Sequence, residues 1–151
     1  MNTLENYLNA LETTISKQAA HHTGISNVNV GWHIEHILLT INAIIDQLQK
    51  STPENYKWKF KIARLLVFSL NKIPRGKAQS PQVVVPQVYS EQSLFNHLTE
   101  TQRKLQTLES LDANKYFNHP FFGNLKKGQT IKFLQIHTKH NLSIINDIIA
   151  S

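Results

Sequence analysis

The stretch that decides the fold is Ile131 to Ile149, IKFLQIHTKHNLSIINDII, near the end of the 151-residue chain. Neither Gly nor Pro interrupts it, and its apolar residues recur every three or four positions, which is the pattern of an amphipathic helix. Burying a polar side chain in a core costs about 1 to 3 kcal/mol unless it finds polar partners. The inward stripe of this helix consists of Leu134, His137, Asn141, Ile144 and Ile148. Because His137 and Asn141 are polar, the stripe predicts a polar site inside a helical bundle.

The same periodicity predicts three more long helices and one short one. The long helices cover residues 3–20, the stretch from Val28 or Asn29 to Gln49, and residues 90–111. The short helix covers residues 56–70, although apolar and basic residues alternate over 57–62 and leave a strand open there. As a helix, this segment would turn inward the side chains of Trp58, Ile62, Leu65, Leu66 and Ser69.

Two other segments lack helical periodicity. Residues 71–89 contain four Pro or Gly residues, which exclude a helix. A connection of this length is either a lid or arm over a pocket or partner, or a plain crossover from one end of a bundle to the other. Residues 112–128, DANKYFNHPFFGNLKKG, place three Phe beside Pro and Gly. They predict a rigid hydrophobic plug that closes one end of the bundle, tied by His119.

Together these elements predict an all-α fold in a single domain of residues 1–151. The architecture expected is a four-helix bundle with up-up-down-down connectivity, a short extra helix and a long crossover loop. The chain has no cysteine, which excludes a disulfide framework, a thiolate nucleophile and a Cys-based zinc site.

Composition also limits the partners. The N-terminus lacks the pattern of a signal peptide and no apolar run is long enough to span a bilayer, so we expect a cytoplasmic protein with no membrane partner. The net charge of +6 comes with no nucleic-acid-binding motif, and no nucleic-acid partner is expected. The one dense basic patch is interpreted as a solvated helix face and consists of Lys57, Lys59, Lys61 and Arg64.

Histidines on two helices are the candidate metal ligands. A catalytic zinc site uses three protein ligands and a water, and His at i and i+4 of one helix is a workable pair. Here the position four residues after His137 is Asn141, a poor ligand, and His140 lies three residues after it on the flank of the stripe. On the helix that ends at Gln49, His36 is the candidate, and His33 is a reserve ligand or a partner of Glu35.

The segments GWHIEHILLTINAI, HPFFGNL and IHTKHNLSII, together with the proline-bearing crossover, resemble the DinB-like superfamily of four-helix bundles. Within that superfamily, the segments resemble in particular an uncharacterised branch with an HPFFG-type loop. The resemblance implies a divalent metal, zinc or nickel, held by three histidines, transfer of a low-molecular-weight thiol, and a homodimer. Residue by residue, His36 and His137 match two of the ligands, and Asn141 stands where the family has the third histidine.

Three interpretations of this site stay open. A metal binds through His36, His137 and either His140 or Asn141, or the groups form a metal-free hydrogen-bond network, or His137 is a general base in a nonmetal pocket. Correspondingly, the chain is a metal-dependent transferase or hydrolase acting on an unidentified small molecule, or a noncatalytic binding or dimerisation bundle with a degenerate site. The wide apolar surface of the helix that ends at Gln49 is the expected dimer interface.

Overall fold

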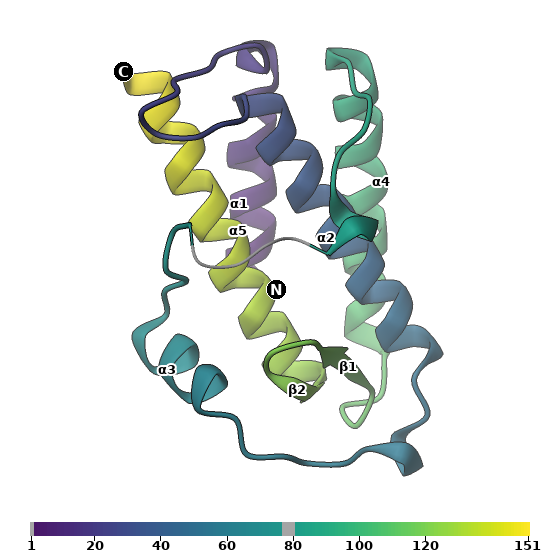
Figure 1. The fold of residues 1–151 in the computed structure, drawn as a ribbon. Helices are drawn as coiled ribbons and strands as arrows, with labels where there is room; N and C mark the ends of the chain where they lie inside the picture. The colour runs from purple at the N-terminus through teal and green to yellow at the C-terminus, as the bar shows by residue number, and fades with distance from the viewer. Residues whose placement is uncertain (1, 77–80) are drawn as a thin grey trace.

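The computed structural model describes residues 2–76 and 81–151. Residues 77–80 of the predicted irregular segment, and residue 1 of the predicted domain, therefore lie outside the described residues. Four long helices form a bundle (Figure 1): α1 (Asn2–Glu12), α2 (Val30–Lys50), α4 (Glu91–Ser110) and α5 (Lys127–Ala150). The shorter elements are η1 (Ile15–Lys17), η2 (Pro53–Asn55), α3 (Ile62–Leu70), η3 (Gln82–Val84), β1 (Tyr116–His119) and β2 (Gly123–Lys126).

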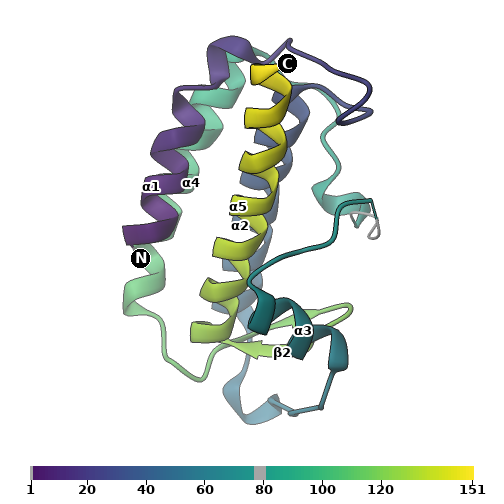
Figure 2. The ribbon, with the colours of Figure 1, turned by 90° about the vertical axis from the view of Figure 1, so that its left-hand side faces the viewer.

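Helices α2 and α4 run parallel to each other, and α1 and α5 run the opposite way (Figures 1 and 2). The α2–α4 contacts advance together along both helices, because Glu35 meets His97 and, farther on, Asp46 meets Lys104. Each helix packs against two neighbours, in the order α1, α4, α2, α5 around the bundle. The connectivity is therefore up-down-down-up, and the predicted up-up-down-down connectivity is wrong.

The reason for this correction lies in the first connection. The Val30 amide donates to the Ala20 carbonyl at 2.9 Å, and the Gly31 amide donates to the Gln18 carbonyl at 2.8 Å. Helix α2 therefore starts at the end of the bundle where the first helical segment stops, and it must run back along it. As the described residues place the four long helices, one connection, from α2 to α4, joins opposite ends of the bundle, whereas up-up-down-down connectivity needs two such crossovers.

The first helix is shorter than predicted. α1 ends at Glu12 and a 3₁₀ turn, η1, continues only to Lys17. The side chains of Thr13 and Thr14 donate back to the carbonyls of Ala10 and Leu11, a bond that competes with helix propagation. The sequence predicts an apolar stripe of Leu4, Leu8, Leu11, Ile15 and Ala19 on this helix. The first four are fully buried, but Ala19, which lies after the helix has ended, is exposed.

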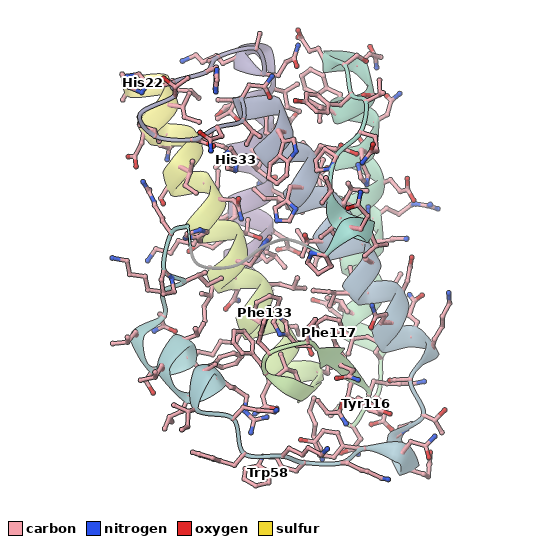
Figure 3. The ribbon with its side chains drawn as sticks, in the orientation of Figure 1. His22, His33, Trp58, Tyr116, Phe117 and Phe133 are labelled. Carbon is pink, nitrogen blue, oxygen red and sulfur yellow. The ribbon has the colours of Figure 1, made fainter. Side chains whose placement is uncertain are left out.

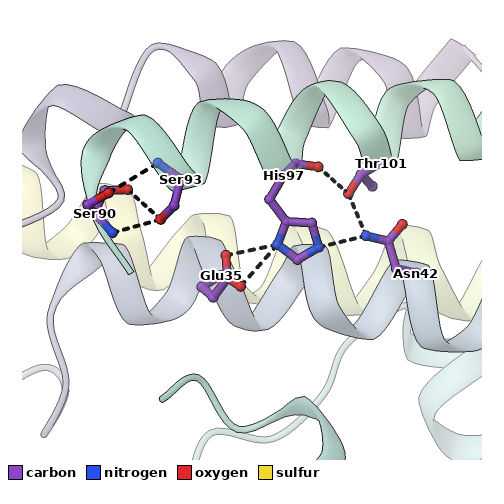
Figure 4. A network of polar contacts seen from close by, with 6 residues as sticks. All are labelled: Glu35, Asn42, Ser90, Ser93, His97 and Thr101. Atoms are coloured by element: carbon purple, nitrogen blue, oxygen red, sulfur yellow. Dashed lines mark hydrogen bonds and ion pairs between the residues drawn. The ribbon is translucent and has the colours of Figure 1, made fainter. Parts of the chain in front are cut away.

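A ladder of polar side chains fixes the register of α2 against α4 (Figure 4). His97 Nδ1 lies 3.0 Å from both Glu35 carboxylate oxygens, so this nitrogen carries the proton. His97 Nε2 then accepts from Asn42 Nδ2 at 2.7 Å, and the same amide nitrogen lies 3.0 Å from Thr101 Oγ1. Glu35 is thus the partner of His97, and the predicted alternative that pairs it with His33 is wrong.

The predicted plug is a β-hairpin, which adds a small sheet to a mostly helical fold. β1 pairs antiparallel with β2, and Phe117 stands opposite Leu125, both buried beneath the end of the bundle. Gly123 opens the second strand with φ +70°, a backbone conformation that disfavours other residues. Phe117 and Phe122 are buried at this end of the bundle, whereas Phe121, the third aromatic of the predicted plug, is 57% exposed.

The short helix differs most from the sequence analysis. α3 begins at Ile62, not at residue 56, and no regular secondary structure covers 57–61. The strictly alternating pattern of that stretch suits an extended chain, and Lys61 has the extended φ of −139°. The predicted inward side chains are exposed instead, and those that pack on the rest of the protein include Arg64, Val67 and Phe68. The side chains that were predicted to point inward but are exposed are Trp58, Ile62, Leu65, Leu66 and Ser69.

Within residues 2–76 and 81–151, no helix is both long enough and apolar enough to pass through a membrane.

Candidate functional site

A cavity of about 420 Å³ lies between α2, α5, the crossover and the hairpin. Most of its wall is aromatic or aliphatic, and the crossover supplies one side of it. The described part of the crossover thus covers one side of the cavity, as the first predicted alternative requires, and the connection also crosses the bundle, as the second requires. Residues that line the cavity include Trp32, His33, His36, Ile73, Pro74, Val83, Val84, Phe117, His119, Phe121, Phe122, Phe133, His137, His140 and Asn141.

His36 is held in one tautomer at this cavity. Its Nδ1 lies 2.7 Å from the Val84 carbonyl oxygen, which only accepts, so Nδ1 carries the proton and Nε2 a lone pair. The indole of Trp32 stacks on the imidazole with ring centroids 5.0 Å apart. Burial lowers the pKa of His36, and the bond to Val84 only partly opposes this effect. His36 is therefore a neutral, oriented acceptor at pH 7.

His137 faces His36 from α5, with the two Nε2 atoms 3.1 Å apart. Because His36 Nε2 is an acceptor, His137 donates its Nε2–H, and its own Nδ1 carries a lone pair. Among the described residues this buried Nδ1 has no hydrogen-bond partner. Burial lowers the pKa of His137 well below its ordinary value, and a positive charge on His36, His140 or His119 would lower it further. The two rings form a neutral pair that shares one proton between its Nε2 atoms.

Asn141 continues the network away from this pair. Its Oδ1 accepts from His33 Nδ1 at 3.0 Å, and its Nδ2 donates to the His137 carbonyl at 3.1 Å. His33 Nε2 then accepts from Ser26 Oγ at 2.9 Å. Burial lowers the pKa of His33, with the Asn141 bond opposing it. The side-chain amide nitrogen of Asn141 also lies 3.4 Å from His137 Nε2.

The predicted metal ligands come together only in part. His36 and His137 meet, and Asn141 lies beside them, but its oxygen is engaged by His33 and its N–H group faces His137. His140 stays half-buried on the flank of α5, where burial and the charge of Arg75 lower its pKa. No group of three or more His, Asp or Glu in the described ranges is placed to hold a metal ion. As placed, His36 and His137 bring two nitrogens together, and a third protein ligand from Asn141 would require its amide to turn away from His33.

His119 ties the hairpin to the cavity, as predicted. Its Nδ1 accepts from the backbone amides of Phe121 and Phe122, at 3.1 Å and 3.2 Å. Its ring stacks on Phe122 with centroids 4.1 Å apart, and it meets the edge of Phe133, which in turn touches His137. Burial lowers the pKa of His119 to about 4. The imidazole is therefore a neutral part of the aromatic wall.

Two parts of this site have no signal in the sequence that predicts them. The Val84 carbonyl, which fixes the tautomer of His36, is a backbone group on an irregular segment and has no signature in the sequence. Trp32 was visible beside the histidines of α2, but its position on the helix gave no reason to expect its ring on His36.

No protein-family model, curated protein or solved structure matches this chain. The resemblance to the DinB-like superfamily stays a prediction.

Proposed function

We propose that the protein binds a small, mainly apolar molecule in this cavity and that the His36–His137 pair recognises one polar group on it. The observation that supports this most is the contact between the two rings, with Nε2 atoms 3.1 Å apart, at a cavity whose wall is mostly aromatic and aliphatic. A volume of about 420 Å³ lies in the range of small-molecule sites. An apolar ring with a single polar substituent matches such a cavity.

The protonation of the pair defines that polar group. In the free site the His137 Nε2–H donates to the lone pair of His36 Nε2. A hydroxyl that takes the place of this bond would accept from His137 Nε2–H and donate to His36 Nε2, so the pair complements a group that both donates and accepts. A carboxylate would require a proton on one ring, and burial opposes protonation of both. A neutral alcohol or phenol is therefore the expected class of ligand.

Phenol and toluene test this directly, because they have nearly the same shape and differ in one hydroxyl. Isothermal titration should give tighter binding of phenol by the wild-type chain, about threefold to tenfold, which is the worth of one neutral hydrogen bond. His137→Phe and His36→Phe should each remove this preference. His22→Ala, at an exposed position outside the cavity, is the control. Equal affinity of the wild type for the two probes, or a preference that survives both variants, would contradict the proposal.

A metal-dependent transferase of a low-molecular-weight thiol, or a hydrolase, is the second candidate. The observation that favours it is the convergence of two imidazole nitrogens, His36 Nε2 and His137 Nε2. Against it, Asn141 would have to turn its amide and give up its present bonds to His33 and to the His137 carbonyl. Elemental analysis of the tag-free protein separates the two. Stoichiometric zinc or nickel that is lost in His36→Ala and His137→Ala would favour the second candidate.

A further inference from the structure

The segment between α2 and α4 holds all of the chain's excess positive charge. Residues 55–90 contain seven of the sixteen Lys and Arg residues and none of the ten Asp and Glu residues. The remaining nine basic and ten acidic residues nearly cancel, so the net charge of +6 comes entirely from this segment. Such an asymmetry directs a protein toward an anionic partner.

The first half of the same segment exposes large apolar side chains. Each is more than half exposed, from 55% at Leu65 and Leu66 to 72% at Leu70. Single exposed apolar residues are ordinary, but a contiguous series marks an interaction site. We call this series the apolar ridge; it consists of Trp58, Phe60, Ile62, Leu65, Leu66 and Leu70.

The part of the ridge on α3 is the outer face of a well-anchored helix, while the ring of Trp58 lies against the Arg64 guanidinium, whose carbon is 5.5 Å from the ring centroid. On the inner side of α3, the buried guanidinium of Arg64 donates to the carbonyls of Lys59 and Phe122, at 2.8 Å and 3.3 Å. The ring of Phe68 packs edge-on against Phe122, with centroids 6.1 Å apart. Figure 2 shows α3 at the periphery, beside the four long helices, and Figure 3 shows Trp58 at the edge of the molecule. The inner face of α3 is thus fixed to the hairpin, which leaves the outer face free.

Lysines alternate with the first residues of the ridge. Lys57, Lys59 and Lys61 are exposed and alternate in sequence with Trp58 and Phe60. Trp and Phe favour the boundary between lipid headgroups and acyl chains, while lysine side chains reach back to phosphate groups. This is the composition of a segment that lies in a membrane interface without crossing it.

We propose that the apolar ridge and its lysines bind the surface of an anionic lipid bilayer. A second copy of the chain fits less well, because pairing two ridges would bring two strongly basic segments together. A nucleic acid would satisfy the lysines but leaves no contact for Ile62, Leu65, Leu66 and Leu70. A bilayer surface offers contacts to both groups of residues. Its anionic headgroups can bind the lysines, and the apolar layer beneath them can bind the apolar ridge.

Vesicle co-sedimentation of the full chain tests the proposal. Binding is expected to vesicles of phosphatidylcholine mixed with phosphatidylglycerol, with much weaker binding to phosphatidylcholine alone and a decline as salt increases. Reversing the three lysines (Lys57→Glu, Lys59→Glu, Lys61→Glu) should lower the partition coefficient by about a hundredfold or more. The matched control makes the same change at exposed positions elsewhere (Lys17→Glu, Lys50→Glu, Lys139→Glu) and should lower it by less than about tenfold.

Two double variants test the contribution of the apolar ridge. Trp58→Ser with Phe60→Ser, and separately Leu65→Ser with Leu66→Ser, change exposed side chains and should each abolish most vesicle binding while the helical circular dichroism is kept. In a Trp32→Phe background, the fluorescence of Trp58 should shift to the blue on vesicles and be quenched by brominated lipid.

Three results would overturn the proposal. Vesicle binding by these apolar variants that equals the wild type would show that the ridge is not the contact. Binding of a single-stranded oligonucleotide without binding of vesicles would assign the basic segment to nucleic acid. A stable dimer in sedimentation velocity, with Trp58 shielded from acrylamide before any lipid is added, would assign the ridge to a second copy.

Discussion

Protonation of His119 should destabilise the hairpin, and the resulting loss in the free energy of unfolding follows from the pKa of this side chain. In the folded protein this pKa is about 4, against 6.5 for an unperturbed histidine. Below pH 6.5 the unfolded chain therefore binds a proton that the folded chain does not, so stability falls as the pH falls and this loss ends near pH 4. One pH unit is worth about 1.4 kcal/mol, so acidification to about pH 5 removes about 2 kcal/mol through this side chain. Burial of the imidazole is the cause of the low pKa. Protonation would also remove the two hydrogen bonds that Nδ1 accepts from backbone amides, which hold the hairpin.

His119→Asn isolates this contribution, because the amide oxygen of Asn accepts hydrogen bonds but does not titrate. Urea denaturation of both proteins at about pH 7 and about pH 5 gives four free energies of unfolding. The wild type should lose about 2 kcal/mol more than the variant on acidification. The other buried histidines, including His33, His36 and His137, titrate in both proteins and cancel in this comparison. Equal losses in the two proteins would refute the assignment of a buried neutral imidazole to His119.

Two further predictions concern packing. Gly31→Ala should cost about 1 to 3 kcal/mol in urea denaturation, because the new Cβ would lie 2.6 Å from Cε2 of Tyr89; the cost should shrink in a Tyr89→Ala background, and an unchanged cost would show that the clash is not with that ring. Arg64→Ala should leave most of the stability intact but release the stretch 57–61 from the hairpin, so that trypsin cleaves there faster; a cleavage rate equal to the wild type would contradict the anchoring role of the guanidinium.

The sequence was sufficient where one face of a helix meets a core. The stripe of α5 is as predicted, with Leu134, Asn141 and Ile148 buried and His137 facing the cavity, because a period of 3.6 residues leaves one orientation that buries the apolar set. The same reasoning failed at α3. There the apolar residues surround the helix, so periodicity could not decide which face packs inward, and the contact of Arg64 with the hairpin decided it.

Long-range geometry was beyond the sequence analysis for a different reason. Connectivity depended on two backbone hydrogen bonds that place Val30 and Gly31 beside the end of the first helical segment. The partner of His36 is a carbonyl that lies 48 residues away in the chain. Backbone groups carry no residue-type signal, so sequence patterns could nominate the histidines of the site but could not show their tautomers. The departure at Asn141 was visible in the sequence, while its bond to His33 became evident only in the fold.

The neutral His36–His137 pair is best tested by long-range proton–nitrogen NMR of the chain labelled with ¹⁵N in its histidines. At neutral pH, His36 should show a protonated Nδ1 and a bare Nε2, His137 should show a protonated Nε2 and a bare Nδ1, and the Nε2 signals of both should shift when phenol is added but not with toluene. The proposal of a neutral pair that recognises a ligand would be contradicted by a cationic ring at either position or by a metal-bound Nε2 signal that chelation removes. It would also be contradicted by Nε2 resonances that do not shift when phenol is added.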